Sequence, residues 1–128
     1  MADERESADV TLRIPAQAEY VALARLALSA VSRLLELDAD DVADLKLAVT
    51  EAATCLMPEE GEADADPLSF FFHVGDDGLT MAVEGGTGPG RHDEERELGR
   101  AIIRATVDEF AYDDRSMRLV KYARAAAS

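Results

Sequence analysis

The sequence has few of the residues that stabilise small secreted domains. It contains no tryptophan, four phenylalanines and three tyrosines, and Cys55 is the only cysteine. A chain with a single cysteine can form neither an internal disulfide nor a zinc site built from several thiolates. No run approaches the roughly 18 apolar residues of a membrane span, and residues 1–7 are too polar for a signal peptide. We therefore expect a soluble cytoplasmic domain.

Basic residues are scarce as well. The chain has 13 Lys and Arg against 27 Asp and Glu, a formal net charge of −14, and no Lys or Arg lies between Lys46 and Arg91. Nucleic acids and anionic membranes attract basic surfaces, so this balance disfavours both as direct partners. The 48% of hydrophobic residues is too high for a disordered acidic chain, and 128 residues suit one domain.

The hydrophobic pattern predicts eight elements in the order β-α-α-β-β-α-β-β. Strands are expected at 10–14, 68–74, 79–83, 109–112 and 117–122, and helices at 16–36, between Asp38 and Pro58, and from near Leu98. Asp38 is expected to cap the second helix, and residues 75–78 are expected to form a hairpin turn. Two adjacent hairpins favour an α+β two-layer sandwich, with helices on one face of a mostly antiparallel or mixed sheet. Residues 10–123 form the expected single domain, with flexible tails at 1–9 and 124–128.

Each predicted helix has an apolar face that is expected to meet the sheet. These faces are Tyr20, Ala24, Ala27, Val31 and Leu34 in the first helix, Val42, Leu45, Val49, Ala52, Ala53 and Leu56 in the second, and Leu98, Ala101, Ile102 and Ala105 in the third. The first helix carries further apolar residues off its face, namely Ala22, Leu26 and Leu28. This surplus predicts a homodimer built from the first strand and the first helix.

The second helix holds the first candidate for chemistry. Glu51 and Cys55 are four residues apart and are expected on one stripe, opposite the core face. A carboxylate there is a general base if a substrate hydroxyl comes within reach, and otherwise an ordinary surface acid. Cys55 has no basic neighbour in sequence to lower its thiol pKa, which favours an inert small hydrophobe over a redox sensor.

The second candidate is the segment 85–90, which holds four of the eight glycines. Consecutive amides in such a loop can bind phosphate when a helix follows, and the alternative is a plain flexible loop.

Two weaker candidates are expected to have structural roles rather than chemical ones. His73 and His92 have no spaced ligand partner for a metal, and the run 70–72 of three phenylalanines predicts strand packing with one ring exposed.

The order of these segments resembles the anti-sigma regulatory kinases of the RsbW type, which are serine kinases with the fold of histidine-kinase and Hsp90-type ATPases. Residues 45–54 are similar to the family's LAVTEACTN helix, and residues 99–109 to its GLFIIRALVDE segment. The resemblance runs from Leu12 to Tyr122. It implies ATP and Mg²⁺ as cofactors, and Glu51 at the position of the catalytic glutamate.

Several positions depart from the family pattern. Cys55 stands where an asparagine ligates Mg²⁺, although that hard ion prefers oxygen ligands. Gly86, or Gly85 in a shifted register, stands where an aspartate reads adenine, while Gly88 and Gly90 fit the rest of that glycine box. In the second glycine box Gly99 matches, but Glu97 and Arg100 do not. These departures predict weak or lost ATP binding and no metal site.

The function expected from the resemblance is an anti-sigma-like regulator in the bacterial stress response. It would bind an RNA polymerase sigma factor, its antagonist, or both, pair as a homodimer, and use Arg25 as a partner-binding residue. One alternative is an active serine kinase that phosphorylates the antagonist, with Glu51 as base. The other is a ligand-binding α+β domain outside this family.

Overall fold

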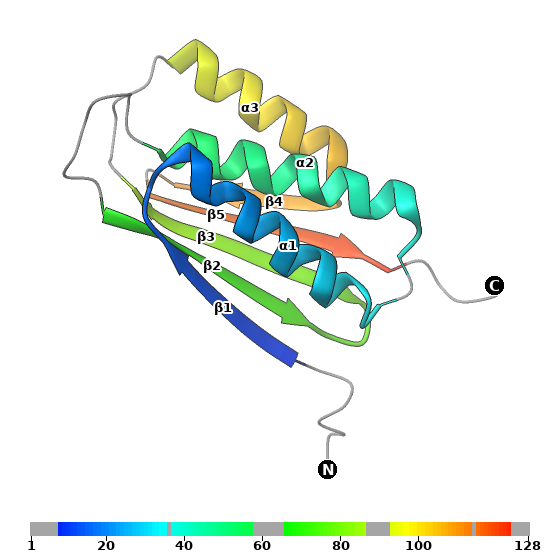
Figure 1. The fold of residues 1–128 in the computed structure, drawn as a ribbon. Helices are drawn as coiled ribbons and strands as arrows, with labels where there is room; N and C mark the ends of the chain where they lie inside the picture. Colours follow the sequence, from blue (N-terminus) through cyan, green and yellow to red (C-terminus); the bar gives the residue numbers. More distant parts are fainter. Residues whose placement is uncertain (1–7, 36, 58–65, 87–92, 114, 124–128) are drawn as a thin grey trace.

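A computed structural model describes residues 8–35, 37–57, 66–86, 93–113 and 115–123, and three helices cover one face of a five-stranded sheet (Figure 1). The sheet is antiparallel throughout, in the order β1-β2-β3-β5-β4. Its strands are β1 (Ala8–Ile14), β2 (Asp66–Val74), β3 (Gly78–Gly86), β4 (Glu109–Tyr112) and β5 (Ser116–Tyr122). The predicted α+β sandwich is therefore confirmed, with the antiparallel form of the sheet.

The strands alternate between a buried face and an open face. In β2, Phe70 and Phe72 are fully buried under the helices, whereas Phe71 is 39% exposed on the opposite face. This confirms the expected strand packing with one exposed ring. The β2–β3 hairpin closes with a hydrogen bond of 3.0 Å from the Gly75 amide to the Gly78 carbonyl. No helix covers the open face within the part of the chain that the structure describes.

The helices are α1 (Val21–Ser32), α2 (Ala39–Leu56) and α3 (Asp93–Thr106). Helix α2 lies between the other two, with α1 on the β1–β2 side of the sheet and α3 on the β4 side (Figure 1). Asp38 caps α2 by accepting a hydrogen bond of 2.8 Å from the Asp41 amide, as its sequence predicts. No helix among the described residues is both long and apolar enough to cross a membrane.

The predicted face of the first helix is wrong in part. A short 3₁₀ turn at Ala18–Tyr20 precedes α1, and the helix ends at Ser32 rather than at residue 36. Tyr20 and Leu34 therefore lie outside the α-helix and are 37% and 61% exposed. The buried face is instead Val21, Ala24, Leu28 and Val31. Leu28, expected off the core, is fully buried.

The predicted face of the third helix is also wrong. Helix α3 begins at Asp93, several residues before the expected start, and its buried residues are Gly99, Ile103 and Thr106. Leu98 is 65% exposed, and Ala101 and Ala105 are exposed as well. Gly99 determines which side of α3 is buried, because this small residue lies against α2. A pattern built from apolar side chains does not include glycine, so it identifies a different face.

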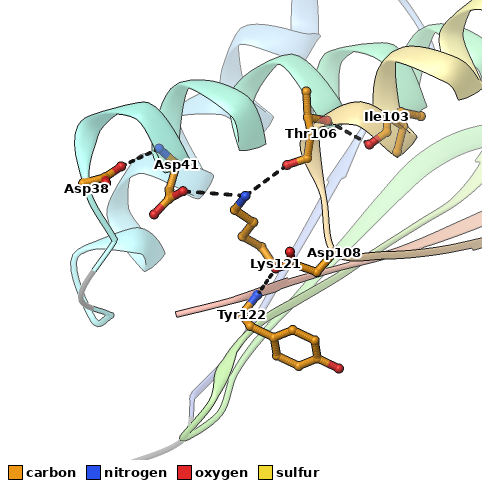
Figure 2. Close-up of polar contacts among 7 residues, drawn as sticks. All are labelled: Asp38, Asp41, Ile103, Thr106, Asp108, Lys121 and Tyr122. Carbon is orange, nitrogen blue, oxygen red and sulfur yellow. Dashed lines mark hydrogen bonds and ion pairs between the residues drawn. The ribbon is translucent and has the colours of Figure 1, made fainter. Parts of the chain in front are cut away.

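A polar cluster that is buried at Asp41 and Thr106 links one end of the helical layer to the sheet (Figure 2). The Lys121 ammonium of β5 lies 3.6 Å from the Asp41 carboxylate of α2, and it donates to the Thr106 carbonyl of α3 at 3.3 Å. Both charged side chains are almost fully buried. The Tyr122 amide of β5 donates to the Asp108 carboxylate, just after α3, at 2.7 Å. This cluster sets the orientation of α2 and α3, and so of the site between them.

Candidate functional site

The candidate site lies where α3 crosses α2. A Cβ atom placed on Gly99 would lie 2.8 Å from Cys55 Sγ and 3.4 Å from Glu51 Oε1. Only glycine allows the two helices to approach this closely without displacing the thiol. Residues from two separate motifs of the sequence thus meet at one helix crossing.

The expected position of Cys55, opposite the core face, is wrong. Cys55 is 4% exposed because α3 covers this stripe of α2 and forms a second buried contact surface. Its Sγ lies 4.0 Å from the Arg96 carbonyl of α3, to which it is a weak donor. A thiol enclosed in this way packs as a small hydrophobe, which supports the structural interpretation over a redox sensor.

Glu51 is half-buried at the edge of the same crossing. Its carboxylate lies beside Gly99, because a Cβ atom on that glycine would be 3.4 Å from Glu51 Oε1. A carboxylate acts as a general base only where a substrate hydroxyl comes within hydrogen-bonding distance.

The first two residues of the glycine segment have a backbone conformation and surroundings that exclude any side chain. Gly85 and Gly86 have φ angles of 112° and 70°. A Cβ on Gly85 would lie 2.1 Å from the Pro67 carbonyl oxygen, and one on Gly86 would lie 1.8 Å from the Leu56 carbonyl oxygen. A carboxylate cannot be presented from either position in this conformation. Gly88 and Gly90 lie outside the described residues.

Arg115, which the sequence does not single out, holds this glycine pair in place. Its carbonyl accepts from the Gly85 amide at 3.0 Å, while its guanidinium donates to the Gly86 carbonyl at 3.1 Å and to the Asp66 carboxylate. The Arg115 amide and the Ser116 hydroxyl donate to Asp113 and hold the pKa of that exposed carboxyl below its usual value. These contacts join residues far apart in sequence, so no local motif could reveal them.

Two cations of α3 lie over aromatic rings of β4. The Arg100 guanidinium lies 4.6 Å from the ring centre of Tyr112, and that of Arg104 lies 5.6 Å from the ring of Phe110. The two rings are themselves stacked on β4 at 5.3 Å. Both arginines thus contact the edge strand by cation–π interactions.

Arg25 lies on the other side of α2. Its guanidinium donates to the Thr50 hydroxyl at 3.3 Å, so the side chain bridges α1 and α2 while remaining half-buried. His73 of β2 is paired with Asp9 of β1 on the open face of the sheet. His92 lies outside the described residues.

Together these features define a two-layer α+β domain in which α3 crosses α2 in close contact at Gly99. Residues 14–121 match the family of the histidine kinase-like ATPase domain, and the chain belongs to this family. The likeness to RsbW-type proteins is also confirmed. A serine-protein kinase RsbW from Bacillus licheniformis is 34% identical over 104 residues, covering 80% of this chain and 65% of the relative.

A second relative is the serine-protein kinase RsbW of Bacillus cereus strain Q1, 32% identical over 74 residues, or 58% of this chain and 46% of the relative. The chain spans about half the length of such curated relatives. The crystal structure of the RsbU and RsbW domains of a Mycobacterium tuberculosis protein matches with a TM-score of 0.69 and 17% identity, covering 93% of this chain and 34% of that chain. That likeness confirms the fold.

The ATPase family implies ATP and Mg²⁺ in general, and two positions at which the resemblance implies their ligands carry Cys55 and Gly86. The expected metal ligand is the buried thiol of Cys55, a soft donor already covered by α3. No carboxylate can occupy the position of Gly86. Among the described residues, no group of three or more His, Cys, Asp or Glu side chains is placed to hold a metal ion.

Proposed function

We propose that the chain is an anti-sigma-like regulator that works by binding a sigma factor, its antagonist, or both, with weak or lost ATP binding. Family membership and the RsbW relatives support the class. The acidic surface fits a partner with basic DNA-binding faces, because opposite charges speed encounter and suppress wrong pairings. Under this proposal the protein binds its partner equally well with and without nucleotide.

The close contact between Cys55 and Gly99 carries the second half of this proposal. Phosphoryl transfer depends on positioning and on neutralisation of phosphate charge by Mg²⁺ with Arg or Lys. At this crossing a buried thiol replaces the oxygen ligand, and Arg100 and Arg104 contact β4 instead. The proposed test is capture of the sigma factor on immobilised protein, with and without Mg·ATP. Equal capture is expected, and strict dependence on Mg·ATP would contradict the proposal.

The half-buried Glu51 keeps an active serine kinase as the second candidate. Incubation with the antagonist and labelled ATP separates the two functions. Label transferred to an antagonist serine, and lost in Glu51→Gln, would establish the kinase. No transfer is expected under the regulatory proposal.

The proposed partner surface includes Arg25. Truncation to Arg25→Ala is expected to weaken sigma-factor capture by about tenfold or more, because arginines at interface centres contribute strongly to binding. The melting temperature is expected to change little, since a part-exposed hydrogen bond contributes only about 1 kcal/mol. Thr50→Val is the matched control, because it removes the same hydrogen bond and keeps the charge. Equal losses in both variants would show that Arg25 acts only through α2.

We also propose that two chains pair through β1 and α1. Leu23, Leu26 and Leu34 are 45%, 66% and 61% exposed, an unusual concentration of apolar surface on and just after one helix. Strand β1 is an edge of the sheet, with one side free to pair. Sedimentation velocity at tens of micromolar is expected to give a dimer that dissociates in Leu26→Glu. A monomer of 13.8 kDa would contradict this pairing.

A further inference from the structure

A groove of about 470 Å³ lies between α1 and α2 at the end where the two helices are joined. Its walls come from the last turns of α1, the connecting segment and the first turns of α2. They include Ser29, Ser32, Arg33, Leu37, Val42 and Lys46. Cys55 and Glu51 meet α3 on the other side of α2, so this groove is separate from the candidate site described above.

Two cations line the groove of a chain that is acidic as a whole. The charged residues among its described lining are Arg33, Lys46 and Asp38, and Asp38 is already engaged as the N-cap of α2. Arg33 and Lys46 form no ion pair with any residue that the structure describes. In a chain with a net charge of −14, two such cations on one groove favour an acidic occupant.

The groove has apolar lining residues, and its volume is in the range of known ligand pockets. Leu35 and Leu37, between α1 and α2, and Val42 of α2 are only partly buried. Ligand pockets commonly hold about 300–1,000 Å³ and combine an apolar lining with a few polar groups. A volume near 470 Å³ accommodates one or two branched aliphatic side chains.

A buried hydroxyl in the wall has unused hydrogen-bonding capacity. Ser32 is 5% exposed, and its Oγ has no hydrogen-bond partner among the described residues. Buried polar groups nearly always have a partner. Ser32 therefore offers a donor to a carbonyl or carboxylate oxygen that enters the groove.

We propose that this groove binds a short acidic segment of a partner protein. A leucine-type side chain of that segment packs against the apolar lining, its carboxylates pair with Arg33 and Lys46, and an oxygen accepts from Ser32. Apolar anchors give such a helix-lined groove its affinity, and the flanking charges give it selectivity. The inference concerns a surface outside the family site and does not depend on the proposed function.

The test uses short fluorescein-labelled peptides built from Glu, Leu and Ser, with one counterpart carrying Lys for Glu and another carrying Ser for Leu. Only the Glu–Leu peptide is expected to bind by fluorescence anisotropy, with NMR amide shifts concentrated in residues 29–46. Arg33→Glu with Lys46→Glu is expected to weaken binding by about tenfold or more. The matched control reverses the same charge on the open face of the sheet, with Arg13→Glu and Arg118→Glu.

A third variant separates recognition from folding. Ser32→Ala is expected to reduce affinity by roughly threefold without lowering the melting temperature, because the free protein loses no hydrogen bond. Equal weakening in the open-face control, equal binding of the Lys peptide, or amide shifts centred elsewhere would each overturn the proposal. Failure of the Glu–Leu peptide to bind at millimolar concentration would overturn it as well.

Discussion

Lys121→Ala is expected to destabilise the fold by about 3–5 kcal/mol. The substitution removes the buried ammonium that lies 3.6 Å from the Asp41 carboxylate and that also donates to the Thr106 carbonyl. Breaking a buried pair by removing one partner leaves a charge without its compensating ion, which costs more than the pair itself contributes. Urea unfolding followed by circular dichroism measures the change as a lower midpoint.

Two further variants test whether the loss of stability comes from the uncompensated charge of Asp41. Replacing both members by apolar residues, as Asp41→Leu with Lys121→Met, is expected to recover most of the stability, because no uncompensated charge remains. Arg118→Ala on the same strand is exposed and is expected to stay within about 0.5 kcal/mol. A loss below 1 kcal/mol in Lys121→Ala would show that the cluster in Figure 2 does not hold α2 and α3 to the sheet.

Gly86→Asp is expected to destabilise the protein by about 2–6 kcal/mol rather than to restore an adenine contact. A side chain at this φ of 70° is strained by about 1–3 kcal/mol, and overpacking adds a similar amount. The new Cβ would lie 1.8 Å from the Leu56 carbonyl, which is backbone at the end of α2 and cannot rotate away. Thermal and urea unfolding both report the loss.

Gly75→Asp provides the matched control. A Cβ there meets the His73 ring at 3.6 Å, an ordinary contact, and the change is expected to cost little. A Gly86→Asp variant as stable as the parent, and bound by ATP, would contradict the described conformation of the glycine pair. It would also show that an aspartate at position 86 can contact adenine, as the resemblance to the family implies.

The sequence predicts the order and the type of the elements well, because turns and caps are local. The hairpin at Gly75–Gly78 and the Asp38 cap depend on neighbouring residues and lie where expected. The fold class follows from two adjacent hairpins and is confirmed by the family match.

The helix faces are predicted less well, since small residues can be buried and large ones exposed. Gly99 is buried because it allows α3 to approach α2, and Leu98 beside it remains exposed. The same close approach buries Cys55, which the periodicity of α2 alone places at the surface. Contacts between distant segments, such as Arg115 with Gly86 or Lys121 with Asp41, have no local signature at all.

We propose that this member of the ATPase family binds Mg·ATP weakly or not at all, because Cys55 and Gly86 stand where the resemblance implies an Mg²⁺ ligand and an adenine-reading aspartate. Isothermal titration of Mg·ATP into the protein tests it most directly, with titration in EDTA as the control for metal dependence. The account predicts no saturable heat, corresponding to a Kd weaker than ~1 mM. A saturable, Mg²⁺-dependent isotherm with a Kd of about 100 μM or tighter would contradict it.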